Sequence, residues 1–163
     1  MWLRSTVFLL VFATSALYHI NAQESQCPVT LKIGMSQTTL PVGGEIRAHI
    51  EAKNSSDKDV PWVMNVAESH AELHYQLKVF DNSGLLLVDT PYGRSVRAGV
   101  NGSVVKFALK PGQVFGEDVL LGSLYDLSHP GRYSVQAETT LSIGVDQPQC
   151  TVRSNMLKFL IVK

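Results

Sequence analysis

The chain has 163 residues, of which 45% are hydrophobic and 17% are charged, and its 14 basic side chains balance its 14 acidic ones. This length and composition are those of one globular domain that is large enough to bury a hydrophobic core. Because the charges cancel and no basic run occurs, the sequence offers no electrostatic footprint for nucleic acid or an anionic membrane. We expect neither as a partner.

The first segment is predicted to be an export signal. Arg4 precedes an uncharged, largely apolar run over residues 5–17, and Ala22 then offers a small residue at a plausible cleavage position. An uncleaved anchor helix is the alternative, but this run is shorter than the ~20 apolar residues that a membrane span needs. We therefore predict a signal peptide over residues 1–22, a mature domain over residues 23–163 without a membrane span, and a secreted or periplasmic location.

Two cysteines, Cys27 and Cys150, would remain after cleavage, and we expect them to form one disulfide. An even number of cysteines in a chain bound for an oxidising compartment implies pairing. The alternative is a reactive thiol pair, which usually has the close C-x-x-C spacing that this sequence lacks. A structural bridge between the first strand and the segment before the last strand is the expected outcome.

Alternation of apolar and polar residues runs through the mature chain and predicts β-strands. In the second predicted strand, for example, Ile46, Ala48 and Ile50 would point to one side while Arg47 and His49 point to the other. In chain order the predicted strands cover residues 29–35, 45–53, 72–80, 85–88, 103–109, 114–122, 131–138 and 157–162.

Turn sequences rich in glycine, proline and asparagine separate these strands, as at Asn82-Ser83-Gly84 and His129-Pro130-Gly131. A single sheet could not bury so many one-sided strands, so two sheets must face each other. The predicted class is all-β, an immunoglobulin-like antiparallel β-sandwich of seven to eight strands with one disulfide.

Three long connections are expected, over residues 54–70, 89–102 and 139–149, and loops of this length are often functional. Trp62 in the first, and Tyr92 beside Arg94 in the second, are candidate binding residues that could contact a peptide or a sugar. The alternative is that each aromatic ring caps one open end of the core. Capping is favoured for Trp62, because lone large aromatic residues are mostly buried, while the two interpretations of Tyr92 are evenly balanced.

The segment from His70 to His74 (HAELH) invites comparison with the zinc-protease motif H-E-x-x-H, but its Glu72 is one position late. On a strand, residues four apart are also about 13 Å apart and point in parallel, so the two histidines cannot easily share one ion. A surface metal site that uses the outward-facing His49, His70, Glu72 and His74 is a minor alternative to ordinary solvated side chains. No cofactor is expected.

No catalytic signature stands out. The sequence contains no G-x-S-x-G turn, phosphate-binding loop, EF-hand or dinucleotide fingerprint. Glu117 and Asp118 are neighbours on a predicted strand and would face opposite sides, which is unsuitable for joint acid–base work. We expect a non-enzymatic protein, with an unrecognised hydrolase as the alternative. The sequence leaves open whether the glycosylation sequons at Asn54 and Asn101 are used.

The segment from Leu124 to Tyr133 (LYDLSHPGRY) resembles the tyrosine-corner approach to a late strand of immunoglobulin-like domains, in which a tyrosine hydroxyl closes back on the preceding turn. Tyr133 would take that role. Together with Lys110-Pro111-Gly112 before a strand and Asn54 after EIRAHIEAK, this makes the chain similar to exported bacterial immunoglobulin-like β-sandwich proteins and to the prodomain of deuterolysin-type metalloproteases. It more distantly resembles the bacterial intracellular proteinase inhibitor family.

This resemblance spans roughly residues 28 to 140 and implies a fold and a compartment. Its motifs belong to turns and corners, the metalloprotease catalytic motif is absent, and no inhibitory residue can be matched. We therefore expect a non-enzymatic exported binding or accessory domain that uses loops at one end of the sandwich, for an unknown protein or carbohydrate partner. The alternatives are a proteinase inhibitor that presents an exposed loop such as residues 89–102, and a surface metal-binding protein.

Overall fold

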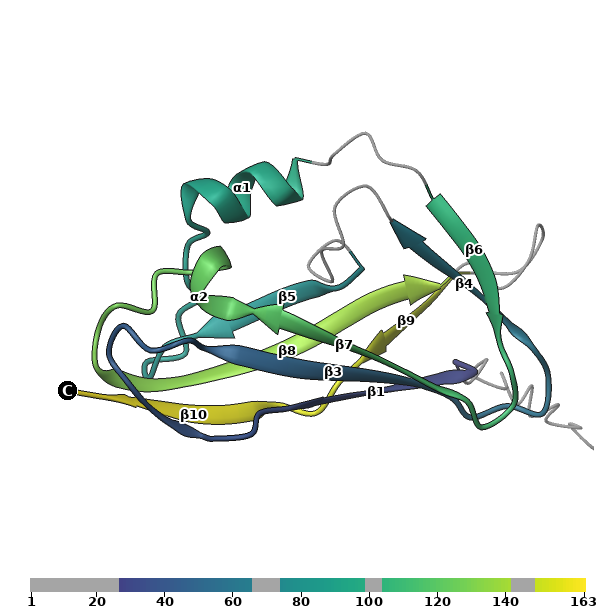
Figure 1. Ribbon diagram of the computed structural model, residues 1–163, viewed down its shortest axis with the longest axis horizontal. Helices are drawn as coiled ribbons and strands as arrows, with labels where there is room; N and C mark the ends of the chain where they lie inside the picture. The colour runs from purple at the N-terminus through teal and green to yellow at the C-terminus, as the bar shows by residue number, and fades with distance from the viewer. Residues whose placement is uncertain (1–26, 66–73, 99–103, 142–148) are drawn as a thin grey trace, which may run out of the picture.

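A computed structural model of the chain describes residues 27–65, 74–98, 104–141 and 149–163. Strands dominate these ranges, and the two helices are short (Figure 1). The predicted signal peptide lies outside the described residues, as do His70, Glu72 and the sequon at Asn101. None of the described helices is long and apolar enough to cross a membrane.

The first sheet is antiparallel, and its hydrophobic side chains alternate as the sequence predicts. Along its central strand, Ala48, Ile50 and Ala52 are fully buried, while the residues between them point away from the core. Its strand order is β1 (Val29–Gly34), β3 (Arg47–Asn54) and β7 (Val114–Leu120).

The second sheet faces the first across the hydrophobic core, to which both sheets contribute (Figure 1). In β8, Val135 and Ala137 are fully buried, and their neighbours Ser134 and Gln136 face outward. The strand order is β2 (Thr39–Pro41), β10 (Leu157–Val162), β8 (Gly131–Leu141) and β5 (Gln76–Phe80), and β9 (Cys150–Arg153) pairs with the far end of β8. Only β2 and β10 pair in parallel among these strands.

A two-stranded antiparallel ribbon, β4 (Val60–Asn65) with β6 (Val104–Leu109), extends one end of the sandwich (Figure 1). Asn54, at the end of β3, holds this ribbon in place because its side-chain nitrogen donates hydrogen bonds to the Lys58 and Leu109 carbonyls, each at 2.7 Å. The ribbon directs Trp62 toward the core, where its ring centroid lies 6.2 Å from that of Phe115.

Two short helices lie at the opposite end, α1 (Pro91–Arg97) and α2 (Leu121–Leu124) (Figure 1). Thr90 begins α1 as its N-cap, with its side-chain oxygen accepting the Gly93 N–H at 2.9 Å. The helices pack closely, because a Cβ atom at Gly93 would stand only 2.5 Å from the Leu124 carbonyl oxygen.

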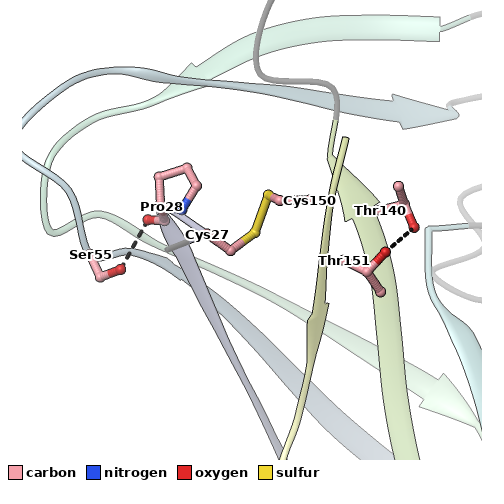
Figure 2. The surroundings of a disulfide bond; sticks show 6 residues. All are labelled: Cys27, Pro28, Ser55, Thr140, Cys150 and Thr151. Carbon is pink, nitrogen blue, oxygen red and sulfur yellow. Dashed lines mark hydrogen bonds between the residues drawn. A yellow bond between two sulfur atoms is a disulfide. The ribbon is translucent and has the colours of Figure 1, made fainter. Parts of the chain in front are cut away.

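The predicted disulfide is present and joins Cys27, two residues before β1, to Cys150, the first residue of β9, with the two Cα atoms 5.7 Å apart (Figure 2). Ser55 reinforces the same corner, since its hydroxyl donates a 3.0 Å hydrogen bond to the Pro28 carbonyl. Further along β1, the Asn155 side chain pairs with both backbone groups of Ile33, at 3.0 and 3.1 Å. The N-terminal strand is therefore tied to the C-terminal strands by covalent and polar links.

The prediction of an all-β sandwich with one disulfide is confirmed, while several elements differ from expectation. The connection predicted over residues 54–70 contains β4, and the one over residues 89–102 contains α1. Residues 85–88, predicted as a strand, form only an isolated bridge between Phe80 and Leu86. The reason is that an apolar run without alternation gives no information on which neighbour, if any, it pairs with.

Candidate functional site

Trp62, one candidate binding residue, is only 3% exposed and packs against Phe115 and the core. It corresponds to the alternative in which the ring caps the core rather than contacts a partner. The reason is its place on β4, directly opposite Phe107 on β6, on the face of the ribbon that turns inward.

Tyr92 and Arg94 lie together on α1, and both side chains reach the surface. Tyr92 is 40% exposed. Arg94 turns back toward the start of the helix, where its guanidinium donates a 2.7 Å hydrogen bond to the Asp89 carbonyl. The structure thus places these two candidates on a rigid, capped helix and not on a loop.

A groove of about 910 Å³ runs beside the start of α1. One wall is formed by residues 88–91, and the other by α2 and by the turn between β2 and β3. Tyr125 lines this groove. Two hydrogen bonds fix its side chain, because its hydroxyl donates a 2.6 Å hydrogen bond to the Leu77 carbonyl and accepts one from the Arg97 guanidinium. Burial is the main cause that raises the pKa of the Tyr125 hydroxyl to about 12.

An apolar segment leads into this groove and remains uncovered by the described residues. Leu85, Leu86 and Val88 are 68%, 58% and 77% exposed. The backbone of the segment is held firmly against β5, since the Leu87 N–H donates to the Val79 carbonyl at 2.8 Å. Together with Tyr92, which follows in the chain, we call Leu85, Leu86 and Val88 the apolar rim.

Two carboxylates flank this end of the molecule in tight turns. Asp81 accepts hydrogen bonds from the Ser83 N–H and hydroxyl and from the Leu85 N–H, at 2.8, 2.6 and 3.0 Å. Asp126, in the groove, accepts from the N–H and the hydroxyl of Ser128 in the same way. These hydrogen bonds stabilise the charged form and lower the pKa of both carboxyl groups.

The described candidate metal ligands, His49 and His74, face different environments. His49 is exposed on the outer face of the first sheet, with its Nδ1 2.7 Å from Asp118 Oδ1. His74 does not point outward as predicted, because the strand begins only at Gln76 and the alternation does not extend back to residue 74. Its side chain is 5% exposed. Among the residues that the structure describes, no three histidine, cysteine or acidic side chains could hold a metal ion together.

His74 instead forms a nearly buried pair with Glu117, which the sequence did not single out. The His74 Nδ1 atom lies 2.8 and 2.9 Å from the two carboxylate oxygens of Glu117, whose side chain is 11% exposed. Glu117 and Asp118 do face opposite sides of the sheet, as the alternation predicts. The position of Glu117 between the inward-facing Phe115 and Val119 was the available signal for a buried carboxylate.

This pair lies among other buried polar groups. The Tyr75 ring packs edge-on against the His74 ring, and burial, together with the charge of Glu117, raises the pKa of the Tyr75 hydroxyl. His74 and Trp62 also line a cavity of about 270 Å³ between β4 and the end of β8. The sandwich therefore has a second candidate site, at the end opposite the apolar rim.

No family model matches the sequence, and no curated protein matches it. Solved structures with a related arrangement include a family 123 glycoside hydrolase from Clostridium perfringens, studied for glycolipid glycan hydrolysis, at 13% identity and a TM-score of 0.38. That match covers 83% of this chain but only 27% of the hydrolase. Another is AvmM, which catalyses macrocyclization in alchivemycin A biosynthesis, at 6% identity and a TM-score of 0.39, covering 83% of this chain and 89% of AvmM. At these values the likenesses carry no argument about what this chain does.

Proposed function

We propose that the chain is a non-enzymatic, exported binding or accessory domain of the immunoglobulin-like type, and that it binds a protein partner through the apolar rim. The observation that carries the proposal is the exposure of Leu85, Leu86 and Val88 beside the 910 Å³ groove. Several large apolar side chains exposed within a few residues of one another are typical of interaction sites.

The immunoglobulin-like assignment has support from strand order and from one side chain. The sheets β1-β3-β7 and β2-β10-β8-β5 correspond to the two-sheet arrangement of such domains. The Tyr133 hydroxyl donates a 2.9 Å hydrogen bond to the His129 carbonyl, four residues upstream, which is the geometry of a tyrosine corner.

Export has support from the disulfide and from the apolar leader. Disulfides persist in oxidising compartments and are rare in the cytosol, so the Cys27–Cys150 bridge is consistent with a secreted or periplasmic location. The test is mass analysis of the protein recovered outside the cytoplasm, where we expect a chain that begins at Gln23. A chain that keeps residues 1–22 would contradict the signal-peptide assignment.

The rim has the properties of a protein-binding surface more than those of a sugar site. Its members are aliphatic except for Tyr92, and its backbone is held by hydrogen bonds to β5, so little conformational entropy is lost on binding. The groove would accept an apolar side chain of the partner, and the charged Asp126 within it favours a basic neighbour on that partner.

A photo-reactive residue at position 86 tests the proposal directly in the native extracytoplasmic fraction. We expect one adduct that saturates and that unlabelled wild-type chain competes away. The Leu85→Ser, Val88→Ser double variant should fail to compete, whereas a Val105→Ser, Val114→Ser variant should compete fully. Val105 and Val114 are also exposed, at 47% and 49%, but lie away from the rim, on β6 and β7. Equal competition by both variants would contradict the proposal.

The structure bears on the proteinase-inhibitor alternative at one part of its expected loop, residues 89–102, of which residues 99–102 lie outside the described ranges. Residues 91–97 are helical and packed on α2, whereas inhibitors offer an extended segment to a protease cleft. No described feature favours metal binding either. We therefore keep a single proposed function.

A further inference from the structure

Burying the His74–Glu117 pair in the interior of a small sandwich has a free-energy cost, because both groups lose their hydration. Both side chains are almost fully removed from water, and the cost of desolvating a charged pair usually cancels most of its attraction. Apolar residues of similar volume would serve stability equally well. Ionisable groups placed in such an environment are concentrated at functional sites.

One further buried polar group near this pair, the Trp62 indole nitrogen, lacks a hydrogen bond within the part of the chain that the structure describes. The Tyr75 hydroxyl is buried as well, and its polar neighbour is Glu117. Leaving a buried donor without an acceptor costs about 1–3 kcal/mol each, so native proteins carry few of them. The orphaned indole nitrogen next to a buried histidine–carboxylate pair marks one region of the interior that is unusually rich in polar groups.

A cavity that Trp62 and His74 line has an open rim and a buried floor. Pro61, Val63 and Thr140 line it and are exposed, while Trp62 and His74 line it and are buried. Thr139 contributes a hydroxyl, which donates a 3.1 Å hydrogen bond to the His74 carbonyl and holds that residue in place. At ~30 Å³ per water, 270 Å³ corresponds to roughly nine water molecules, slightly below the usual size of a ligand pocket.

We propose that this cavity is a binding site for a small uncharged polyol, up to the size of a monosaccharide. The volume excludes larger ligands, and the part of the lining that the structure describes contains no carboxylate, lysine or arginine that would pair with a charged ligand. Hydroxyl groups both donate and accept, so a polyol matches a lining that mixes an indole, an imidazole and two threonine hydroxyls. This site is independent of the apolar rim, which lies at the other end of the sandwich.

The indole N–H of Trp62 provides a direct readout. The chain has two tryptophans, Trp2 and Trp62, so a full-length Trp2→Phe protein labelled with ¹⁵N gives one indole signal. Glycerol, myo-inositol, glucose and galactose are titrated separately. We expect at least one of them to move the Trp62 indole signal in a saturable manner, with the backbone signals of Thr139 and Thr140 moving in parallel.

A matched pair of variants separates a specific site from a general effect. His74→Phe should weaken binding of the active probe at least about tenfold, and Glu117→Gln should also weaken it. His49→Phe removes the other histidine–carboxylate pair, on the outer face of the same sheet, and should bind like the parent protein. The His74→Phe change can also affect folding. Glu117→Gln keeps the size of the side chain, and the affinity of this variant is compared with its own unfolding curve to separate loss of binding from loss of structure.

Three results would overturn the proposal. One is an indole signal that none of the four probes moves, which would mean that the cavity holds water only. Another is a linear shift of many signals across the protein, which reports a solvent effect. The third is equal affinity of the His74→Phe and His49→Phe variants for the active probe.

Discussion

At the level of single residues, Asn54 connects a sequence motif with its physical consequence. Asn54 belongs to a glycosylation sequon, yet it is fully buried. Its amide nitrogen donates two 2.7 Å hydrogen bonds to the Lys58 and Leu109 carbonyls, and its oxygen accepts the Ser56 N–H and hydroxyl. A glycan on that nitrogen is incompatible with the fold, so the folded chain cannot carry a glycan at this sequon.

Replacing Asn54 with alanine should lower the free energy of unfolding by about 2–4 kcal/mol, because it leaves several backbone groups without partners at the base of the β4–β6 ribbon. Denaturant unfolding measures the change. Asn82→Ala, at an exposed turn position, is the control and should stay close to the wild type. A loss at Asn54 no larger than that at Asn82 would contradict the role assigned to the buried amide.

Asp81 predicts a pH dependence with a definite sign. Hydrogen bonds from Ser83 and Leu85 lower its pKa in the folded chain below the ordinary value of 3.8. The stabilisation is therefore present above pH ~3.8 and is lost as the pH falls through the lower folded-state pKa.

We accordingly expect Asp81→Ala to lower the melting temperature at pH 7 and to converge with the wild type in strong acid. Thermal unfolding of both proteins from pH 7 down to about pH 2 measures this difference. Asp57→Ala is the control, because this exposed carboxylate has no hydrogen bond among the described residues. A difference between Asp81→Ala and the wild type that stays constant with pH would rule out the explanation.

At the level of secondary-structure elements, the predictions succeeded where a strand is buried on one face and failed elsewhere. Strands β1, β3 and β8 follow from their alternation, because one face of each meets the core. The β4 strand lies in a stretch that includes Pro61 and does not alternate clearly, and α1 is too short for a helical period to stand out. The conformation of such short elements is determined by contacts with the elements packed against them.

Gly93 shows how α1 depends on such a neighbour. An alanine inside a helix is normally more favourable than glycine, by up to about 1 kcal/mol. At Gly93 the added methyl group would meet the Leu124 carbonyl oxygen at 2.5 Å, so α1 would have to move away from α2.

We expect Gly93→Ala to destabilise the protein by about 1–3 kcal/mol, as overpacking usually does. Gly122→Ala in α2 is the matched control, because a methyl group added at Gly122 would meet nothing within 4 Å, and the change should be neutral or slightly stabilising. Urea unfolding of the two variants gives the comparison. A stabilising effect at Gly93 would mean that the two helices are not in close contact.

At the level of the whole molecule, the disulfide closes a loop between residues separated by 123 positions. In the chain-entropy model, closing a loop of this length stabilises the fold by about 4–5 kcal/mol, because it restricts the unfolded chain. The bridge connects β1, which belongs to the first sheet, to β9 in the second (Figure 2).

The Cys27→Ala, Cys150→Ala double variant should therefore unfold at a much lower denaturant concentration, with a loss approaching about 4–5 kcal/mol. Wild-type protein in a reducing agent should follow the same curve as the variant, which separates the loss of the bridge from the loss of side-chain packing. Unchanged midpoints in both samples would show that the cross-link contributes little.

The residues alone were sufficient for the class of fold, the disulfide and the closure of the Tyr133 hydroxyl on the preceding turn. Alternation, cysteine count and a local turn motif are properties of short stretches. The residues alone were not sufficient for the candidate sites. His74 and Glu117 are 43 positions apart, and Leu85 to Val88 would be ordinary core residues had another element covered them. Alternation states which side chains share a face of a strand. Which faces lose contact with water depends on how the sheets and the ribbon pack, and that is decided by contacts between distant parts of the chain.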